Sequence, residues 1–319
     1  MKDLVSILIL SYRNFEGIYE SLKSVFEQNY DNLEVIISDD GSIDFDKEIS
    51  KINKFVEDNK SDNIKRVVIN DIKINGGTVK NLNSAIEKSQ GKYIKVLSAE
   101  DVFSHKDAIS HYVDFMENTG YEICFSKIRG IKPNGEFVYE LLACETDYAM
   151  LSKYSTDEIL NRLYARNYLP GIAWMIKRDL FEKYGRFLED TRIIEDYPYW
   201  IYLARKGCKF GFLDEVLIDY KLSGVSSGGN YSEMFMNDMM IIYDKYIFPY
   251  DKRYGVFQSV YNMLKKTGLN FYMAKARWNK KSKLQKIGCY IIYCPFFAYT
   301  KLQNIQINNR NKKRGTNGS

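Results

Sequence analysis

Cysteine, proline and histidine are scarce in this sequence of 319 residues, which contains 5 cysteines, 5 prolines and 2 histidines. The cysteines are scattered and form no C-x-x-C pair, which argues against a zinc or disulfide framework and favours a reducing compartment. The shortage of proline, together with only 20 glycines, excludes a collagen-like or low-complexity chain. Hydrophobic residues make up 45% and charged residues 27%, which is enough for a sizeable core.

Long apolar runs are also missing. No stretch reaches the roughly 18 apolar residues that a membrane-spanning helix needs, and the longest candidate, 287–300, contains Pro295. The apolar run Leu4–Leu10 follows an acidic residue and has no small-residue cleavage site after it. It is therefore predicted to be a buried strand rather than a secretion signal. These features favour a cytoplasmic protein.

Acidic residues are absent from one end of the chain. The segment Lys252–Ser319 carries 15 lysines and arginines and no Asp or Glu, so the net charge of +5 leaves residues 1–251 with a net charge of −10. Such an asymmetry suggests a segment that meets an anionic partner. Basic residues precede the aromatic, apolar stretch 287–297, a pattern typical of a helix lying peripherally on an anionic membrane surface.

Two other interpretations of the basic segment must be considered. The same charge would attract nucleic acid, but no nucleic-acid-binding motif accompanies it, so nucleic acid is not expected as a partner. A helical appendage that packs on the acidic part of the chain, or on a second subunit, would also explain the charge. The sequence leaves the membrane and appendage interpretations open.

The first hundred residues alternate between strand-like and helix-like segments. Aliphatic runs typical of buried parallel strands are separated by amphipathic segments. The expected strands are 4–10, 33–38, 65–70 and 92–97, and the expected helices are about 18–30, 44–59 and 79–89. This order predicts a doubly wound, mostly parallel α/β sheet flanked by helices. In such a sheet, ligands bind at the carboxyl ends of the strands.

The rest of the chain is less regular. The expected elements are helices at 107–118, 156–165, 179–184 and 197–206, strands at 121–127 and 172–176, a hairpin near 132–136, and edge strands at 210–213 and 216–220. The predicted divisions are 1–104 and 105–225 as two halves of one domain, 226–305 as a helical, basic and aromatic extension that begins with a flexible connector, and 306–319 as a disordered tail.

Two pairs of acidic residues follow predicted strands. Asp39 and Asp40 end the second strand, and Glu100 and Asp101 end the fourth. Because the ends of neighbouring strands lie close together, these like charges need a cation or hydrogen-bond donors nearby. A hard divalent cation such as Mg²⁺ or Mn²⁺ suits carboxylate oxygens and substrate phosphates. Each pair alone also fits a plain turn or a helix cap.

A series of short motifs runs through residues 1–225. The motifs are Val5–Asn14, Ser21–Val25, Glu34–Ser42, Asn75–Gly77, Asn83–Ile86, Gly91–Asp101, Gly171–Arg178, Phe181–Phe187 and Glu195–Asp196. Each is weak alone, but their order and spacing together resemble the family-2 glycosyltransferases, which have the GT-A fold and include enzymes that build bacterial surface polysaccharides. The resemblance implies a fold in which a nucleoside-diphosphate sugar binds at the carboxyl ends of the sheet.

The resemblance implies roles for donor-binding residues. Tyr12 matches the position that packs against the base, and Asp39 matches the acid that hydrogen-bonds the base or ribose. Asp101 matches the acid that binds the metal ion, Mn²⁺ or Mg²⁺, and Glu100 matches the acid before it, near the ribose or sugar. Asn83 lies in the helix that lines the donor pocket.

The resemblance also implies how the acceptor is activated. Asp196 matches the general base that deprotonates the acceptor hydroxyl in a single inverting displacement, with a glycan or lipid-linked glycan as acceptor. Glu195 lies beside it on the acceptor side. Trp174 either lines the acceptor pocket or packs in the core. At a helix N-terminus the helix dipole lowers the pKa of a carboxyl group, whereas burial raises it.

The sequence departs from the family pattern in two places. Ser98 stands where the acidic cluster usually begins, so the number of metal ligands is uncertain. Lys221 stands where many members have arginine, and the histidine two residues further on is replaced by Ser223. Lysine keeps the positive charge for a diphosphate but lacks the fork of arginine. His105 and His111 are expected on a solvated helix face.

Two other functions stay open. A degenerate, non-catalytic module that binds sugar nucleotides or membranes is suggested by the missing first acid. A nucleotidyltransferase also combines an α/β sheet with carboxylates and a metal ion. That function predicts a glycine-rich basic loop after the first strand, and 11–16 offers no such loop.

Overall fold

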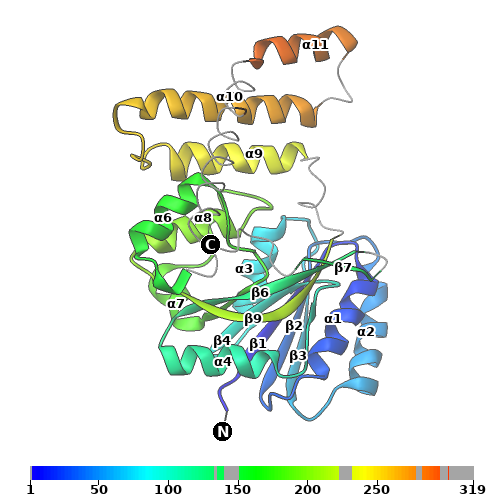
Figure 1. The fold of residues 1–319 in the computed structure, drawn as a ribbon. Helices are drawn as coiled ribbons and strands as arrows, with labels where there is room; N and C mark the ends of the chain where they lie inside the picture. The colour runs from blue at the N-terminus through cyan, green and yellow to red at the C-terminus, as the bar shows by residue number, and fades with distance from the viewer. Residues whose placement is uncertain are drawn as a thin grey trace. The chain divides into compact units, whose positions relative to one another are not determined.

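The chain folds into two compact units, Met1–Ser227 and Gly228–Ser319. The structure is a computed structural model that describes residues 2–132, 135–139, 151–222, 232–277, 282–294 and 301. The N-terminal unit contains a β-sheet with helices on both faces, and the described part of the C-terminal unit is helical (Figure 1). The predicted connector at 226–230 and the tail at 306–319 lie outside the described residues.

One mixed sheet forms the centre of the N-terminal unit. Among the described residues it has nine strands in the order β3-β2-β1-β4-β8-β6-β9-β5, with β7 paired to β6. The strands are β1 Val5–Ser11, β2 Leu33–Asp39, β3 Ile64–Asp71, β4 Tyr93–Ser98, β5 Val102–Phe103, β6 Ile123–Ile131, β7 Phe137–Tyr139, β8 Trp174–Lys177 and β9 Phe210–Lys221. β3, β2, β1 and β4 run parallel, and β8 is antiparallel to both β4 and β6. The predicted mostly parallel α/β sheet is confirmed.

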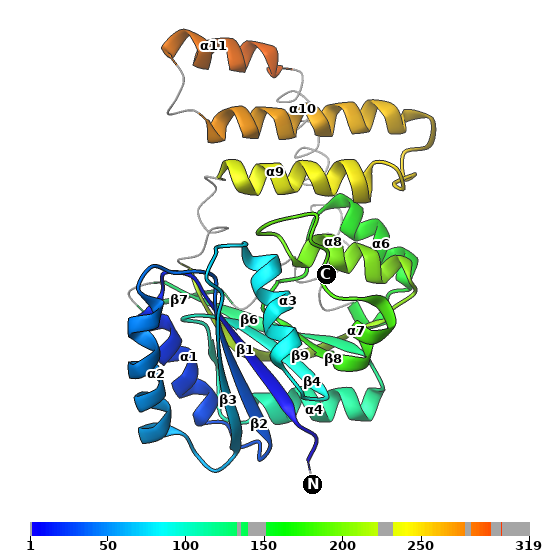
Figure 2. The ribbon, with the colours of Figure 1, turned by 180° about the vertical axis from the view of Figure 1, so that it is seen from behind.

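Helices cover both faces of this sheet. They are α1 Phe15–Phe26, α2 Phe45–Asn59, α3 Thr78–Lys88, α4 Ala108–Thr119, α6 Thr156–Ala165, α7 Arg178–Tyr184 and α8 Asp196–Arg205. Figures 1 and 2 show α3 on the face opposite α1, as right-handed crossovers that run in opposite directions along the sheet require. The apolar stripe of α1, which includes Ile18, Leu22 and Val25, is fully buried against the sheet.

The prediction of two edge strands at 210–213 and 216–220 is wrong. These residues form the single strand β9, which pairs with β6 on one side and with β5 on the other. The pairing with β6 shifts register near Lys127, and this irregularity accommodates the polar pair Asp214–Glu215 within the strand. The predicted hairpin near 132–136 joins β6 to β7, although Pro133 and Asn134 lie outside the described residues.

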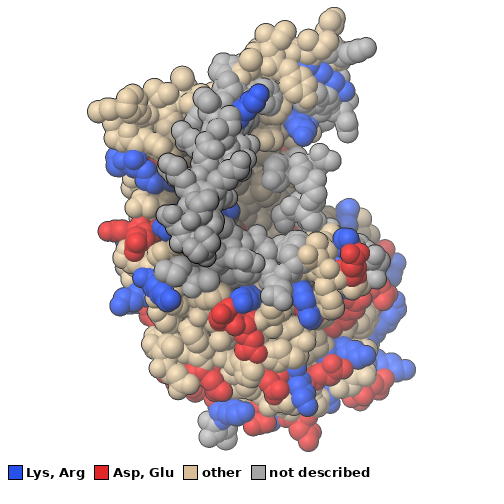
Figure 3. All heavy atoms as spheres, viewed as in Figure 1, with Lys and Arg blue, Asp and Glu red and all other residues tan. Residues whose placement is uncertain are grey.

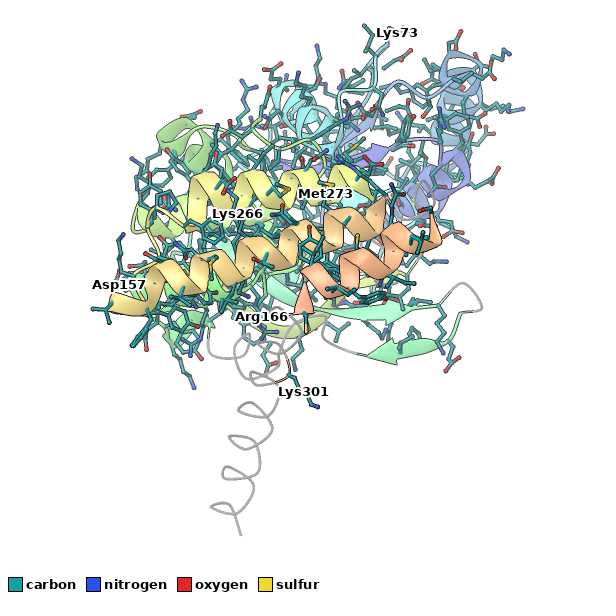
Figure 4. The ribbon with its side chains drawn as sticks, turned by 90° about the horizontal axis from the view of Figure 1, so that it is seen from above. Lys73, Asp157, Arg166, Lys266, Met273 and Lys301 are labelled. Atoms are coloured by element: carbon teal, nitrogen blue, oxygen red, sulfur yellow. The ribbon has the colours of Figure 1, made fainter. Side chains whose placement is uncertain are left out.

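The described residues of the C-terminal unit form a set of helices. They are α9 Glu233–Ile242, a π-helical turn at Tyr243–Ile247, a 3-10 turn at Gly255–Phe257, α10 Gln258–Ala276 and α11 Lys283–Ile292. Figure 4 looks onto α9, α10 and α11, with Lys266 and Met273 of α10 labelled. α10 packs on α9, and the ring of Phe271 in α10 lies 5.9 Å from the ring of Tyr290 in α11. Within the described residues, no helix is both long and apolar enough to cross a membrane.

The positive charge of α10 and the turn before it is partly neutralised inside the unit. Acids of the preceding segment make three ion pairs with this region, and each pair has an N–O distance below 3 Å. The pairs are Asp251 with Arg253 at 2.7 Å, Asp244 with Lys266 at 2.9 Å, and Glu233 with Arg277 at 2.9 Å. Figure 3 shows acidic and basic side chains mixed over one face of the N-terminal unit, and mostly uncharged side chains with some Lys and Arg over α10 and α11.

Gly17 allows α1 to approach the turn that follows β4. A Cβ atom at position 17 would lie 2.7 Å from the backbone nitrogen of Glu100 and 2.8 Å from the carbonyl carbon of Ala99. The carbonyl oxygen of Gly17 accepts a hydrogen bond from the Glu100 N–H at 2.9 Å. Backbone atoms cannot move aside as a flexible side chain can, so only glycine fits here.

Replacing Gly17 by alanine should lower the free energy of unfolding by about 1–3 kcal/mol, because the added methyl group overpacks a site closed by backbone. Urea unfolding followed by circular dichroism measures this loss. Gly288→Ala in α11 is the matched control, since a Cβ there meets nothing within 4 Å. Alanine favours a helix over glycine by about 1 kcal/mol, so the control should be neutral or stabilising. Equal stability of Gly17→Ala and the wild type would contradict the close approach.

Candidate active site

The ends of three parallel strands bring the predicted donor-side residues to one edge of the sheet. In the pairing of β1 with its neighbours, Ser11 lies opposite Asp39 of β2, and Leu10 lies opposite Ser98 of β4. The pairing continues past the strands, because the Ala99 N–H donates to the Leu10 carbonyl at 2.8 Å. The residues that follow the three strands therefore leave the sheet together.

Tyr12 directly follows β1, and Asp39 is the last residue of β2, at this edge of the sheet. The Asp39 carboxylate is fully buried and accepts two hydrogen bonds from Ser42, one from its N–H and one from its hydroxyl, both at 2.7 Å. Burial raises the pKa of Asp39 despite these bonds. The ring of Tyr12 is 44% exposed, and the guanidinium of Arg13 lies 4.9 Å from its centroid. A partly exposed aromatic residue thus follows β1 where the buried acid ends β2.

Asp40 and Asn83 use their polar atoms to hold the structure together. The two oxygens of the Asp40 carboxylate accept the N–H groups of Gly76 and Gly77, each at 2.8 Å, which fixes the start of α3. The Asn83 amide donates to the Phe187 carbonyl at 2.9 Å and accepts the Phe187 N–H at 3.1 Å. These bonds tie α3 to the loop after α7, and donor binding by Asn83 stays a prediction.

Asp101 differs from the other acids because its hydrogen bonding is incomplete. It is 1% exposed, and its Oδ1 accepts the backbone N–H of Lys221 at 3.1 Å. Its Oδ2 is buried and has no hydrogen-bond partner among the described residues. Burial, together with the nearby charge of Glu100, raises the pKa of Asp101 to about 7. An orphaned, buried carboxylate oxygen fits a divalent cation, which would favour the ionised form.

Glu100 sits in a strained turn beside Asp101. Its φ angle is +86°, in the left-handed region that residues other than glycine rarely adopt. Its N–H donates to the Gly17 carbonyl at 2.9 Å, which holds the turn against α1. The side chain of Ser98 is exposed. The turn therefore presents one buried acid, Asp101, and one partly exposed acid, Glu100.

Asp196 begins α8, with Glu195 as the residue before it. Its Oδ1 accepts the N–H of Tyr197 at 2.6 Å, and its Oδ2 accepts the side-chain amide of Asn167 at 2.9 Å. Burial nevertheless raises the pKa of Asp196 to about 6. Gly171 lies against both acids, since a Cβ there would come within 3.2 Å of Glu195 Oε1 and 3.3 Å of Asp196 Oδ2. At this helix N-terminus the effect of burial exceeds that of the dipole.

Comparison with known families agrees with this geometry. The family model described as Glycosyl transferase family 2 matches residues 6–185, more than half of the chain. The chain belongs to glycosyl transferase family 2. It is a glycosyltransferase, and the predicted family and enzyme class are confirmed.

In alignments with curated relatives, about a quarter of the aligned residues are identical to those of this glycosyltransferase. An uncharacterized glycosyltransferase of Haemophilus influenzae is 24% identical, over 93% of this chain and 88% of that protein. The putative teichuronic acid biosynthesis glycosyltransferase TuaG of Bacillus subtilis is 25% identical, over 72% of this chain and 83% of that protein. An uncharacterized glycosyltransferase of Rickettsia conorii is 27% identical over 69% of this chain, which spans only 33% of that longer protein.

Solved structures of similar fold include a mannosyltransferase and TarS. The mannosyltransferase PcManGT of Pyrobaculum calidifontis gives a TM-score of 0.58 at 17% identity, over 96% of this chain and 86% of that one. TarS 1–349 of S. aureus gives a TM-score of 0.54 at 16% identity, over 86% of this chain and 88% of that one. At this identity the likeness shows the fold alone, and it identifies the N-terminal unit as a GT-A fold.

A buried lysine of this glycosyltransferase was missed by sequence reasoning. Lys95 of β4 is fully buried, and its Nζ donates to the carbonyl oxygens of Val96, at 2.8 Å, and of Ile172. Burial lowers the pKa of Lys95 to about 7, and its positive charge favours the ionised form of Asp101. The sequence feature that could have identified it is a lysine within a strand that was predicted to be covered on both faces, where a charged side chain would be buried.

For Trp174, the sequence left the acceptor pocket and the core as alternatives. Its ring is fully buried, with the ring of Phe187 at 5.6 Å and that of Trp200 at 6.1 Å. The side chain therefore belongs to the aromatic core, which was the alternative interpretation. Asn167, which was not predicted, contacts Asp196 instead, and no motif in the sequence marks it.

If Asp196 is the general base that the resemblance implies, nucleotide release by this glycosyltransferase should fall as the pH drops through about 6, because protonated Asp196 cannot accept a proton. Asn167→Ala should move this acidic limb to higher pH, since the lost hydrogen bond favoured the carboxylate and its removal raises the pKa of Asp196. The pH profile of kcat/KM for nucleoside diphosphate release measures the shift. Asn59→Ala, at an exposed helix position, is the control. An acidic limb at the same pH in Asn167→Ala and the wild type would show that Asn167 does not lower the pKa of the group that controls this limb.

Proposed function

We propose that this chain transfers a sugar from a nucleoside-diphosphate sugar to a glycan or lipid-linked glycan, with inversion at the anomeric carbon. The observation that carries the proposal is Asp101, a buried acid with one unpaired oxygen where β4 ends. Among proteins of similar fold, TarS has been solved with UDP and with UDP-GlcNAc, and PcManGT with GDP-Man and Mn²⁺. TuaG is named for teichuronic acid biosynthesis, which supports a polysaccharide acceptor.

The donor would bind where β1, β2 and β4 end. Tyr12 offers an exposed ring for the base, and Asp39 offers a carboxylate beside it for base or ribose. Asp101, with Glu100 near it, would hold Mn²⁺ or Mg²⁺ against the diphosphate. When bound, the cation neutralises the charge that develops on the leaving nucleoside diphosphate. Lys221 holds Asp101 through its backbone N–H, and its Nζ lies 3.3 Å from Glu20.

Asp196 would act as the general base. Its carboxylate takes the proton of the acceptor hydroxyl while the hydroxyl oxygen attacks the anomeric carbon, and the bond from that carbon to the diphosphate oxygen breaks. A pKa of about 6 leaves Asp196 ionised at neutral pH yet basic enough to accept a proton. Asn167 orients the carboxylate, and Glu195 lies next to it on the acceptor side.

Thermal shift with UDP-, GDP- and dTDP-sugars, each with and without Mn²⁺, tests the donor site. One nucleotide should raise the melting temperature in a metal-dependent way, because a ligand that binds the folded state stabilises it. Since the pKa of Asp101 is about 7, this metal-dependent shift should grow from pH 6 to pH 8 as the carboxyl group loses its proton. Asp101→Asn should remove the metal dependence. Asp196→Asn should keep the shift but lower nucleotide release by about 10²–10⁴-fold.

The control for both substitutions is Asp58→Asn, on the exposed side of α2. Nucleotide release that is unchanged in both active-site variants would contradict the assigned roles. Binding of a sugar nucleotide by the wild type without any turnover would favour the non-catalytic module that the missing first acid suggests. The variants must unfold like the wild type for either result to count.

We further propose that the C-terminal unit meets an anionic membrane surface. In α11, Leu284, Ile287 and Ile291 are 81%, 50% and 71% exposed, and their spacing places them on one face of the helix. The segment 252–319, which contains α11, has no acidic residue. Exposed apolar side chains beside basic residues, on a helix too short to span a bilayer, suit the interface of anionic lipids.

Flotation with vesicles tests this surface. The protein should bind vesicles that contain phosphatidylglycerol, and binding should weaken with added salt, because each basic residue near the surface contributes roughly 1 kcal/mol. Replacing Leu284, Ile287 and Ile291 by serine should abolish binding. The control replaces Ile43 and Ile74, equally exposed in the N-terminal unit, by serine. An absence of binding at low salt would favour the appendage interpretation.

A further inference from the structure

Two histidines and a glutamate come together away from the proposed donor site. His105 precedes α4, His111 lies within α4, and Glu215 belongs to β9. His111 Nδ1 lies 2.8 Å from Glu215 Oε2, and His105 Nε2 lies 3.3 Å from Glu215 Oε1. One potential ligand atom from each residue lies within 4.8 Å of the others. The two histidines, which were expected on a solvated helix face, therefore lie together with Glu215. We call His105, His111 and Glu215 the histidine–glutamate cluster.

The backbone holds the members of this cluster in place. Phe103 of β5 pairs with Ile218 of β9, and the next residue, Ser104, extends the pairing. Its N–H donates to the Leu217 carbonyl at 3.0 Å, and its hydroxyl donates to the Val216 carbonyl at 2.6 Å. Ser104 is next to His105 in the chain, and Val216 is next to Glu215. These bonds therefore hold the backbone of His105 close to that of Glu215.

His105 Nε2 is the atom that points to a ligand. It is shielded from solvent and makes no hydrogen bond of good geometry with the described residues, although Glu215 Oε1 lies 3.3 Å away. The other ring nitrogen, Nδ1, accepts the N–H of Asp107 at 3.3 Å. A metal ion at Nε2 would displace the proton from that nitrogen and leave one on Nδ1, at the expense of this long hydrogen bond.

We propose that the histidine–glutamate cluster binds Zn²⁺ through His105, His111 and Glu215. Imidazole nitrogen and carboxylate oxygen are ordinary zinc ligands, at about 2.0–2.2 Å from the ion. A tetrahedral ion with such bonds separates its ligand atoms by about 3.4 Å. Glu215 Oε1 lies 3.0 Å from His111 Nδ1 and 3.3 Å from His105 Nε2, which is near that value. Three protein ligands leave the fourth position to water. Mg²⁺ and Mn²⁺ prefer oxygen ligands and suit Asp101 better.

Zinc at this site would brace the strand that completes the donor side. It would link α4 to β9 at Glu215, and the same strand ends at Lys221, whose N–H holds Asp101. The role is structural rather than catalytic. The inference rests on the geometry of the cluster and does not depend on the proposed function.

Zinc titration of the full chain tests the site. Calorimetry should show a binding event with ZnCl₂, and the melting temperature should rise. His111→Ala and Glu215→Gln should each remove both effects. Asp101→Asn should keep them, which separates this site from the donor site. Asp114→Asn, on the same helix, is the matched control.

Cobalt absorption identifies the ligands. Co²⁺ bound by nitrogen and oxygen gives weak visible bands, whereas binding by cysteine gives an intense band in the near ultraviolet. The expected spectrum has only the weak bands, and Glu215→Gln should abolish them. The proposal is overturned if the wild type binds no zinc, if folded His111→Ala binds it equally well, or if the spectrum shows thiolate ligands.

Discussion

Burial of acidic side chains at the carboxyl edge of the sheet is the constraint on which the N-terminal unit depends. A carboxylate removed from water must gain hydrogen-bond donors or a cation, or else take up a proton. Asp39 gains two donors from the turn that follows β2, and Asp40 gains two from the start of α3. These bonds fix both turns against the sheet. Oδ1 of Asp101 accepts the N–H of Lys221, but Oδ2 accepts no hydrogen bond from the described residues, so this oxygen still needs a donor or a cation.

Two of the buried acids have pKa values shifted toward neutral pH. Asp101 has a pKa of about 7, and Asp196 has a pKa of about 6 although two groups donate to it. Burial outweighs the hydrogen bonds in both cases. The buried cation of Lys95 works in the opposite direction for Asp101, because it favours the ionised form. A cation that binds Asp101 must therefore compete with a proton, whereas Asp196 is already largely ionised at pH 7.

Local pattern and long-range pairing differ in how well a sequence encodes them. Continuous aliphatic runs identified β1 to β4, and parallel pairing then required Asp39 and Asp101 to leave the sheet at one edge. The contact of Asn167 with Asp196 joins positions 29 residues apart, and that of Lys95 with Ile172 joins positions 77 apart. Side-chain packing decides such contacts, and no periodicity encodes them. The same limit left Trp174 undecided between the core and the acceptor side.

The C-terminal unit shows why the charge of a segment is not the charge of a surface. All charged residues of the segment that begins at Lys252 are basic. The acids that pair with three of them precede this segment in the chain. Three of its positive charges are balanced in this way within the unit. The attraction to an anionic surface must therefore come mainly from charges outside these pairs. The sequence of α11 contains Lys283 and Lys286 together with exposed apolar side chains, so electrostatic and hydrophobic contributions to membrane binding would act on the same helix.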